Sequence, residues 1–384
     1  MLTKQDMDRI NSLPQDKMVL MAIVNTNPSS VDNSSSALAT RIKSHAKDEA
    51  IPPTLLSRLL ERVSADQREF GKSQIYVLGE DIEESIGVQL DLEERLHFGR
   101  PLRSVLMSVL EVHPRVGVLA VDREWGRFFV LEQGELTEMR REQNPDVGSG
   151  GDSQMTGRTR VPGANNGGET ADGPQSSSGN DLFQNYLDAS EQKFFNALQA
   201  ELEPLMKEND LKYLALVGPD ERRANFKAEI PTTARFEIIA ETNVEVGPGH
   251  APSQSLLEKI MPMVEEFKGV IAERLLEQVQ EKGIMNLENV LEAVQEGRVY
   301  ALLIPQDGAQ LHLFRSHNPE VPFYSGKKDL SESPLDGSLM ERVTLEEILP
   351  DLSDQYGLEI HRMTGDHGEK LVREYGGLAA LVRY

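Results

Sequence analysis

The sequence is interrupted near its middle by a stretch that cannot build a packed core. Residues 143–180 contain nine Gly, five Ser, four Asn and three Pro, with only Val147, Met155 and Val161 as large apolar residues. So little apolar surface does not offset the roughly 1–2 kcal/mol per residue that ordering a backbone costs. The stretch separates a predicted hairpin from a predicted long helix within one domain. A loop of this kind is either functional or a tolerated disordered insertion.

The composition indicates a cytoplasmic globular protein. Hydrophobic residues at 39% and charged residues at 27% are ordinary for a soluble chain. The first 17 residues lack the apolar core of a signal peptide, and no run approaches the ~18 apolar residues of a membrane span. The absence of Cys excludes disulfides and thiolate metal sites.

The net charge of −23 argues against non-specific binding to nucleic acid, which depends on Lys and Arg. At physiological salt, however, charges farther apart than about 8 Å are largely screened. Local basic patches can therefore oppose the overall sign, and a nucleic-acid partner stays open.

Hydrophobic patterns predict an α/β protein of three domains. Short apolar runs predict strands, and apolar residues spaced by about 3.6 positions predict helices. The predicted strands are Val19–Val24, Ile75–Leu78, Gly117–Val121, Arg127–Glu132, Tyr213–Val217, Arg235–Ala240, Val299–Ile304 and Leu358–His361. The predicted helices are Ala37–Lys47, one opened by Pro52 and Pro53, one from Gly99 to His113, Asp181–Met206, one around Pro262, Asn286–Glu296 and Leu345–Gln355. The predicted domains are residues 1–114, 115–248 and 249–384, with a linker at Val246–Ser253.

Common catalytic motifs are absent from the sequence. It contains no Walker-type phosphate loop, no dinucleotide-binding Gly pattern after a strand, no GxSxG and no HExxH. Two small groups leave an alternative open: His361 with His367 as a zinc pair, and an acid/base pair among Asp122, Glu124 and Glu132 on one hairpin. In both cases solvated surface is the simpler interpretation. We expect no catalytic residue, no metal and no cofactor.

Three stretches resemble one family. Residues 283–305 (GIMNLENVLEAVQEGRVYALLIP) resemble the helix, Gly and strand signature in the third domain of archaeal and eukaryotic class I release factors and Pelota. Residues 374–384 (EYGGLAALVRY) resemble the closing segment of those proteins. Residues 117–139 and 213–230 resemble their second domain, with hairpin, long helix and strand in matching order. The chain looks like the bacterial branch that includes Balon-type ribosome hibernation factors.

The resemblance implies a decoding-site domain, a central RNase H-like domain with the long loop, and a C-terminal α/β/α sandwich that contacts a translational GTPase. It implies a non-catalytic ribosome-binding factor that occupies the A site of idle or stressed ribosomes. Its partners would be 16S and 23S rRNA and elongation factor Tu, with no membrane. Two alternatives stay open: a peptidyl-tRNA-hydrolysing release or rescue factor, and a stress protein that no longer binds ribosomes.

In release factors the counterpart of the long loop carries a Gly-Gly-Gln tripeptide that enters the peptidyl transferase centre. Here the residues directly before the helix read SSSGND, and the nearest imitations are Gly167-Gly168-Glu169 and Gly173-Pro174-Gln175. Glu169 brings a negative charge to a site that would need a neutral amide, and Pro174 lacks an N–H group. Hydrolysis would have to use Gln175 or Glu169.

Charge in the loop also disfavours catalysis near rRNA. Residues 143–180 carry Arg158 and Arg160 against four carboxylates. The arginines that the family has at the start of the helix are replaced by Leu182, Asn185 and Leu187. The resemblance nevertheless assigns Arg158, Arg160, Gly167, Gly168, Glu169 and Gln175 to the peptidyl transferase side.

Other basic residues are candidates for rRNA contact. Arg41-Ile42-Lys43-Ser44 lies near the position where release factors carry Asn-Ile-Lys-Ser for stop-codon reading, so Arg41 and Lys43 are assigned to the decoding side. Arg140 and Arg141 lie at the base of the loop, and Arg222 with Arg223 and Lys327 with Lys328 form further basic pairs. Each is equally consistent with solvated surface.

Overall fold

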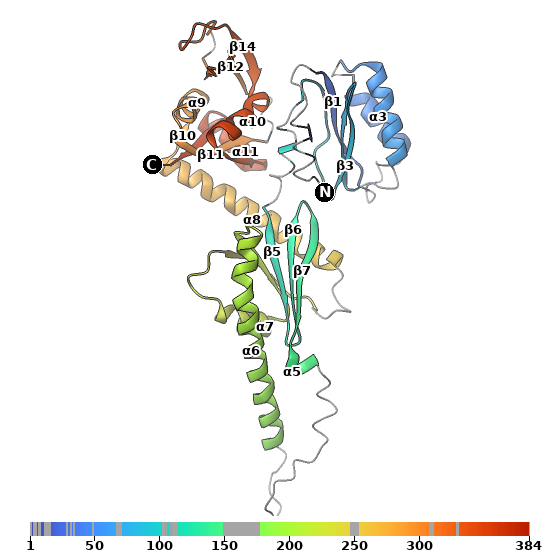
Figure 1. Cartoon of the computed structure of the whole chain (residues 1–384), viewed down its shortest axis with the longest axis vertical. Coiled ribbons are helices and arrows are strands. Elements are labelled where there is room, and N and C mark those ends of the chain that lie inside the picture. Colours follow the sequence, from blue (N-terminus) through green and yellow to red (C-terminus); the bar gives the residue numbers. More distant parts are fainter. Residues whose placement is uncertain are drawn as a thin grey trace, which may run out of the picture. The chain divides into compact units, whose positions relative to one another are not determined.

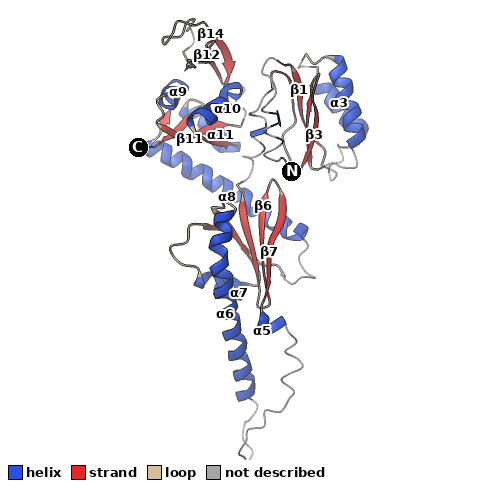
Figure 2. Cartoon of the chain, viewed as in Figure 1, coloured by secondary structure: helices blue, strands red, loops and turns tan. Residues whose placement is uncertain are grey.

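The computed structural model describes residues 2, 6, 9–10, 17–27, 30, 33, 35–47, 50–66, 71–101, 104, 106–107, 109, 114–148, 177–245, 253–306, 311–327 and 330–383. The chain divides into two compact units. One is Met1–His113 together with Glu266–Tyr384, and the other is Pro114–Glu265. Helices and strands alternate in both, which confirms the α/β class (Figure 2).

The N-terminal part is built on a four-stranded antiparallel sheet of order β3-β2-β1-β4. Its elements are β1 Val19–Asn25, α2 Ser35–His45, α3 Pro53–Asp66, β2 Ser73–Leu78, β3 Glu83–Val88 and β4 Arg95–Gly99. Both faces of β1 and β2 are buried, because α2 and α3 cover one face and the described residues of 2–10 and 104–109 pack on the other. The strands β3 and β4 were not predicted, since each mixes polar and apolar residues.

The central unit contains a five-stranded sheet of order β7-β6-β5-β8-β9 (Figure 1). Its elements are β5 Val116–Val121, β6 Trp125–Glu132, β7 Glu135–Gln143, α5 Pro145–Gly148, α6 Ser177–Glu208, β8 Tyr213–Val217, α7 Asp220–Glu229 and β9 Glu237–Thr242. β5, β6 and β7 are antiparallel, whereas β8 and β9 run parallel to β5. This order is the one expected for an RNase H-like domain.

Side chains along each strand of the central sheet point alternately into two cores, as the two-residue period of a strand requires. Val118 faces a cluster completed by the N-terminal turns of α8, Ser253–Lys282. Leu119 faces a second cluster, in which Phe194, Leu198 and Leu202 of α6 form the stripe that the sequence predicts. The N-terminal half of α6 extends beyond the ends of β6 and β7 (Figure 1).

The C-terminal part is a four-stranded sheet of order β10-β16-β11-β15 between helices. Its elements are β10 Ile284–Met285, α9 Leu287–Gln295, β11 Val299–Pro305, α10 Leu345–Tyr356, β15 Glu359–Met363, α11 Gly365–Tyr375 and β16 Ala379–Val382. α9 and α10 cover one face, and α11 with the C-terminal part of α8 covers the other. The α/β/α sandwich is therefore as predicted.

A second, three-stranded sheet is inserted between β11 and α10. It has the order β13-β12-β14, from β12 His312–Ser316, β13 Tyr324–Ser325 and β14 Met340–Thr344. The strands are short and carry few apolar residues, so their pattern did not predict them. None of the helices in the described part of the chain combines the length and the apolar composition that a membrane-spanning helix needs.

The predicted limits of the three domains stay a prediction. Leu256, Ile260 and Val264 of α8 lie in a core of the central unit, whereas Val279 of the same helix packs in the C-terminal part.

Candidate functional site

The base of the long loop is held by Asn144, which directly follows β7. This side chain is 1% exposed. Its backbone N–H donates to the carbonyl oxygen of Glu124 at 2.7 Å, and its Nδ2 donates to that of Arg123 at 3.1 Å. Its Oδ1 accepts from the N–H of Asp146 at 3.1 Å and from Oγ of Ser190 at 3.3 Å. Asn144 therefore joins the end of β7, the β5–β6 turn and the middle of α6.

A second contact at the loop base is centred on Glu191 of α6, which is 3% exposed. Its Oε2 lies 2.7 Å from Nη1 of Arg222 in α7 and 3.0 Å from Nε of Arg123 in the β5–β6 turn. Nδ2 of Asn225 donates to Oε1 at 3.2 Å. Burying a lone carboxylate costs several kcal/mol, and two guanidinium groups compensate for that cost here.

The carboxylate of Asp122, a member of the acidic group on the predicted hairpin, lies in the β5–β6 turn. Its Oδ1 accepts from the backbone N–H groups of Glu124 at 2.8 Å and Trp125 at 2.6 Å. Burial raises the pKa of Asp122, and the two N–H groups oppose that rise. The carboxylate is thus committed to closing the β5–β6 turn.

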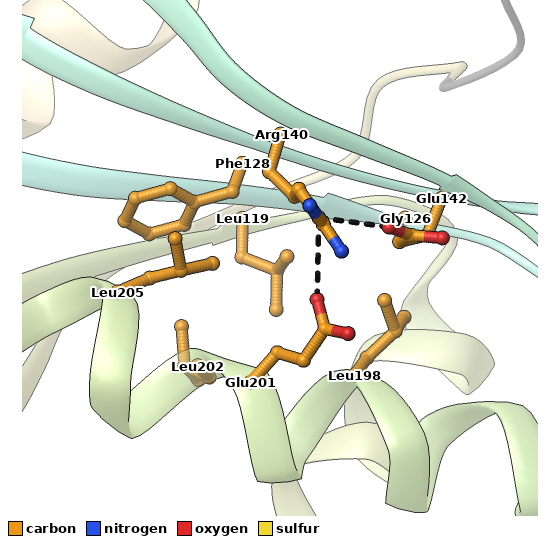
Figure 3. Close-up of a pocket in the computed structure, with 9 residues that line it drawn as sticks. All are labelled: Leu119, Gly126, Phe128, Arg140, Glu142, Leu198, Glu201, Leu202 and Leu205. Atoms are coloured by element: carbon orange, nitrogen blue, oxygen red, sulfur yellow. Dashed lines mark ion pairs between the residues drawn. The ribbon is translucent and has the colours of Figure 1, made fainter.

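Arg140 lies over a small apolar cleft between the sheet and α6 (Figure 3). Its Nε is 2.8 Å from Oε1 of Glu142 and 3.4 Å from Oε2 of Glu201. The floor of the cleft is apolar: it consists of Leu119, Phe128, Leu198, Leu202 and Leu205. The guanidinium group of Arg140 therefore links β7 to α6.

Arg141 is also paired with a carboxylate. Its Nε donates to Oε1 of Glu138 and its Nη2 to Oε2, each at 2.7 Å. Oε2 also accepts from the buried Arg127 at 2.9 Å. Hydrogen bonds from Arg141 and Arg127 lower the pKa of Glu138 to about 2. Both predicted loop-base arginines are therefore held by carboxylates of the central unit.

In the N-terminal part, Arg41 and Lys43 differ in their surroundings. The guanidinium of Arg41 lies 2.7 Å from Oε2 of Glu94 and donates to Oδ1 of Asn33 at 2.7 Å and to the carbonyl of Asn25 at 2.9 Å. Lys43 is exposed on α2. Arg41 thus ties α2 to the segment after β1, while Lys43 faces solvent.

The remaining candidates are distributed over the chain. Arg158, Arg160, Gly167, Gly168, Glu169, Gln175 and Lys328 lie outside the described residues. Arg223 is bound by Asp220 and Glu241, and Lys327 lies 3.6 Å from Glu288. His361 is on β15 and His367 on α11, a helix that the sequence did not predict.

Asn144, Ser190 and Glu191 were not singled out from the sequence. A signal was present, because Glu191 lies four residues after Leu187 and three before Phe194. It therefore occupies a position of the apolar stripe of α6, where a carboxylate needs a buried partner.

Residues 102–265 match the family model of bacterial archaeo-eukaryotic release factor family 10. The matched segment includes the whole loop base described above. No curated protein matches the chain.

Several solved structures are similar to the chain. A model of ribosome-bound archaeal Pelota and ABCE1 is 14% identical, with 100% of this chain and 94% of that chain covered and a TM-score of 0.42. Dom34 of S. cerevisiae, a translation termination-like factor, is 11% identical, with 99% and 93% covered and a TM-score of 0.40. The archaeal translation termination factor aRF1 is 14% identical, with 100% and 99% covered and a TM-score of 0.27.

Proposed function

We propose that this chain is a non-catalytic ribosome-binding factor, which occupies the A site of idle or stressed ribosomes as Balon-type hibernation factors do. The family match over residues 102–265 supports a role in translation. The non-catalytic part of the proposal depends on how charge is arranged at the loop base.

The four arginines at the loop base, Arg123, Arg140, Arg141 and Arg222, are each held by a carboxylate. Tight tracking of rRNA needs cations that neutralise phosphates, and these four would first have to leave their present partners. An element that fills a site through shape and many weak contacts does not need them. The charge arrangement therefore favours occupancy over precise placement of a reacting group.

The loop sequence supports the same choice. Hydrolysis of peptidyl-tRNA requires N–H groups and a neutral amide within hydrogen-bond reach of the ester carbonyl. Glu169 is charged where an amide is needed, and Pro174 next to Gln175 has no N–H. With two arginines against four carboxylates, residues 143–180 would repel phosphate.

The proposed partners are 16S and 23S rRNA in the A site and elongation factor Tu, which would contact the C-terminal sandwich. In this arrangement the N-terminal part, with Lys43 exposed, faces the decoding side. The protein would act in the cytoplasm.

Peptide release tests the proposal directly. We expect the purified protein to release no peptide from ribosome-bound peptidyl-tRNA above background, with or without a stop codon in the A site. Gln175→Ala and Glu169→Ala should leave ribosome occupancy nearly unchanged, whereas deletion of residues 148–179 should weaken it modestly. Release that disappears in either point variant would instead identify a hydrolytic release or rescue factor.

Cosedimentation with 70S ribosomes tests the remaining alternative. Ribosomes from starved and growing cells, each at two salt concentrations, should bind the protein, with more bound to the idle ribosomes. A chain that stays in the supernatant in all four conditions would be a stress protein without ribosome binding.

A further inference from the structure

Two leucines project from a single turn of the three-stranded sheet. Leu335 is 63% exposed and Leu339 is 62% exposed, which makes them the most exposed large hydrophobic side chains among the described residues. Single exposed leucines are ordinary on protein surfaces. Two of them in the turn Glu332–Leu339, defined here as the apolar turn, need a separate explanation.

Hydrogen bonds hold the apolar turn in one conformation. The N–H of Ser333 donates to the carbonyl of Ser338 at 2.7 Å, and the N–H of Gly337 donates to that of Ser333 at 2.9 Å. Gly337 has a φ of 72°, which favours glycine. The carboxylate of Asp336 accepts from Nδ2 of Asn318 at 2.8 Å and from the hydroxyl of Ser338 at 2.8 Å.

The sheet that carries the turn is firmly attached to α9. Nε2 of Gln295 donates to the carbonyl of Tyr324 at 2.9 Å, and the N–H of Tyr324 donates to Oε1 of Gln295 at 2.8 Å. The hydroxyl of Ser325 donates to Glu288 at 3.1 Å. The two leucines are therefore presented on a rigid base.

Rigidity makes the apolar turn suited to binding. A pre-ordered turn does not lose loop entropy when a partner covers it, so that most of the gain from burying leucine side chains becomes affinity. The fold gains nothing from leaving these side chains in water.

The charges around the leucines restrict the kind of partner. Glu332 and Asp336 lie within the turn, and Glu320 lies on the adjoining segment; all three are exposed. Hydrogen bonds from Asn318 and Ser338 lower the pKa of Asp336 to about 2, so its charge persists at any physiological pH. Three carboxylates repel a phosphate backbone and attract lysine or arginine.

We propose that the apolar turn inserts Leu335 and Leu339 into an apolar pocket rimmed by lysine or arginine on a basic protein of the ribosome. This inference rests on the proposed function and names one of its partners. It separates the C-terminal insertion, which would bind protein, from the elements that would approach rRNA.

The experiment measures binding of the full chain to purified 70S ribosomes. We expect the double variant Leu335→Ser with Leu339→Ser to bind at least tenfold more weakly than the wild-type chain. Val372→Ser is the matched control, since Val372 is 54% exposed on α11 in the same unit and should change affinity less than twofold. All three side chains are exposed, so that unchanged circular dichroism is expected and is checked first.

A charge reversal decides between protein and RNA. Glu332→Lys should weaken binding several-fold if the rim of the pocket is basic, and should strengthen binding if the turn faces rRNA phosphate. A photo-crosslinker in place of Leu335 should label a ribosomal protein. Equal binding by the double variant, stronger binding by Glu332→Lys, or labelling of rRNA would overturn the inference and leave the proposed function standing. A wild-type chain that does not bind ribosomes would overturn both.

Discussion

The guanidinium of Arg222 lies 2.7 Å from the carboxylate of Glu191, and this contact joins α7 to α6 at the base of the long loop. The two residues are 31 positions apart in the chain. Arg123 reaches the same carboxylate from the β5–β6 turn. Three elements of the central unit are thus locked at the point where α6 leaves the sheet.

Replacing Glu191 should loosen this junction. In Glu191→Gln the neutral amide leaves two partly buried guanidinium groups without their shared anion, which we expect to cost about 2 kcal/mol. The measurement is native-state hydrogen exchange of the amides in β5, β8 and the first half of α6.

Asp188→Asn is the control for this prediction. Asp188 pairs with Arg123 at 3.3 Å, but its side chain is 55% exposed, and exposed pairs contribute only ~0–1 kcal/mol. If both variants exchange alike, the burial of Glu191 carries no special weight.

Gly218 should tolerate no side chain. It follows β8 with a φ of 141°, and an added Cβ would lie 2.0 Å from the carbonyl oxygen of Val121 at the end of β5. We expect Gly218→Ala to cost about 3 kcal/mol or more, because a backbone atom must move. At Gly297 φ is 71°, but an added Cβ would meet no non-neighbouring atom within 4 Å. We therefore expect Gly297→Ala to cost only about 1–2 kcal/mol. The free energy of unfolding of each variant is measured in urea, with hydrogen exchange reporting on the unit that carries the substitution. Equal losses of stability in the two variants would contradict this expectation.

The pair between Glu138 and its arginines should give acid-dependent stability. The folded pKa of about 2 lies below the ordinary value of 4.5, so the carboxylate stabilises the folded state above pH 4.5 and loses that contribution as the pH falls toward 2. Because Glu138 is partly exposed, we expect about 1 kcal/mol at neutral pH relative to Glu138→Gln. The difference between the two unfolding curves should shrink on acidification, and a difference that grows would contradict the assignment.

Lys43 should contribute directly to ribosome binding, whereas Arg41 should act through the fold. Lys43→Ala should weaken binding and lower the salt slope by about one, as the loss of one phosphate contact predicts. Arg41→Ala should also destabilise the segment after β1, since Glu94, Asn25 and Asn33 lose their shared partner. Salt titration of cosedimentation measures the slope, and an unchanged slope in Lys43→Ala would remove this residue from the rRNA-facing surface.

Elements with strong local patterns could be predicted from the sequence alone. The apolar runs Gly117–Val121 and Tyr213–Val217 predict two strands, which the structure has as β5 and β8. The spacing of Phe194, Leu198 and Leu202 predicts the face that α6 buries. The resemblance to release factors also came from the sequence, and the family match over residues 102–265 supports it.

Which charged residues are free to bind a partner depends on contacts between parts of the chain that are far apart in sequence. The strand β7 was not predicted, because it lies at the edge of the sheet and its residues are mostly polar. Without that strand, Arg140 and Arg141 had the pattern of a phosphate-binding pair. Arg127 meets Glu138 through the register of β6 and β7, and Arg140 meets Glu201 because α6 packs on this face of the sheet. No local pattern encodes either contact. The same reason applies to Glu191: its partners lie 68 and 31 residues away, and they meet because β5 and β8 end at the same edge of one sheet.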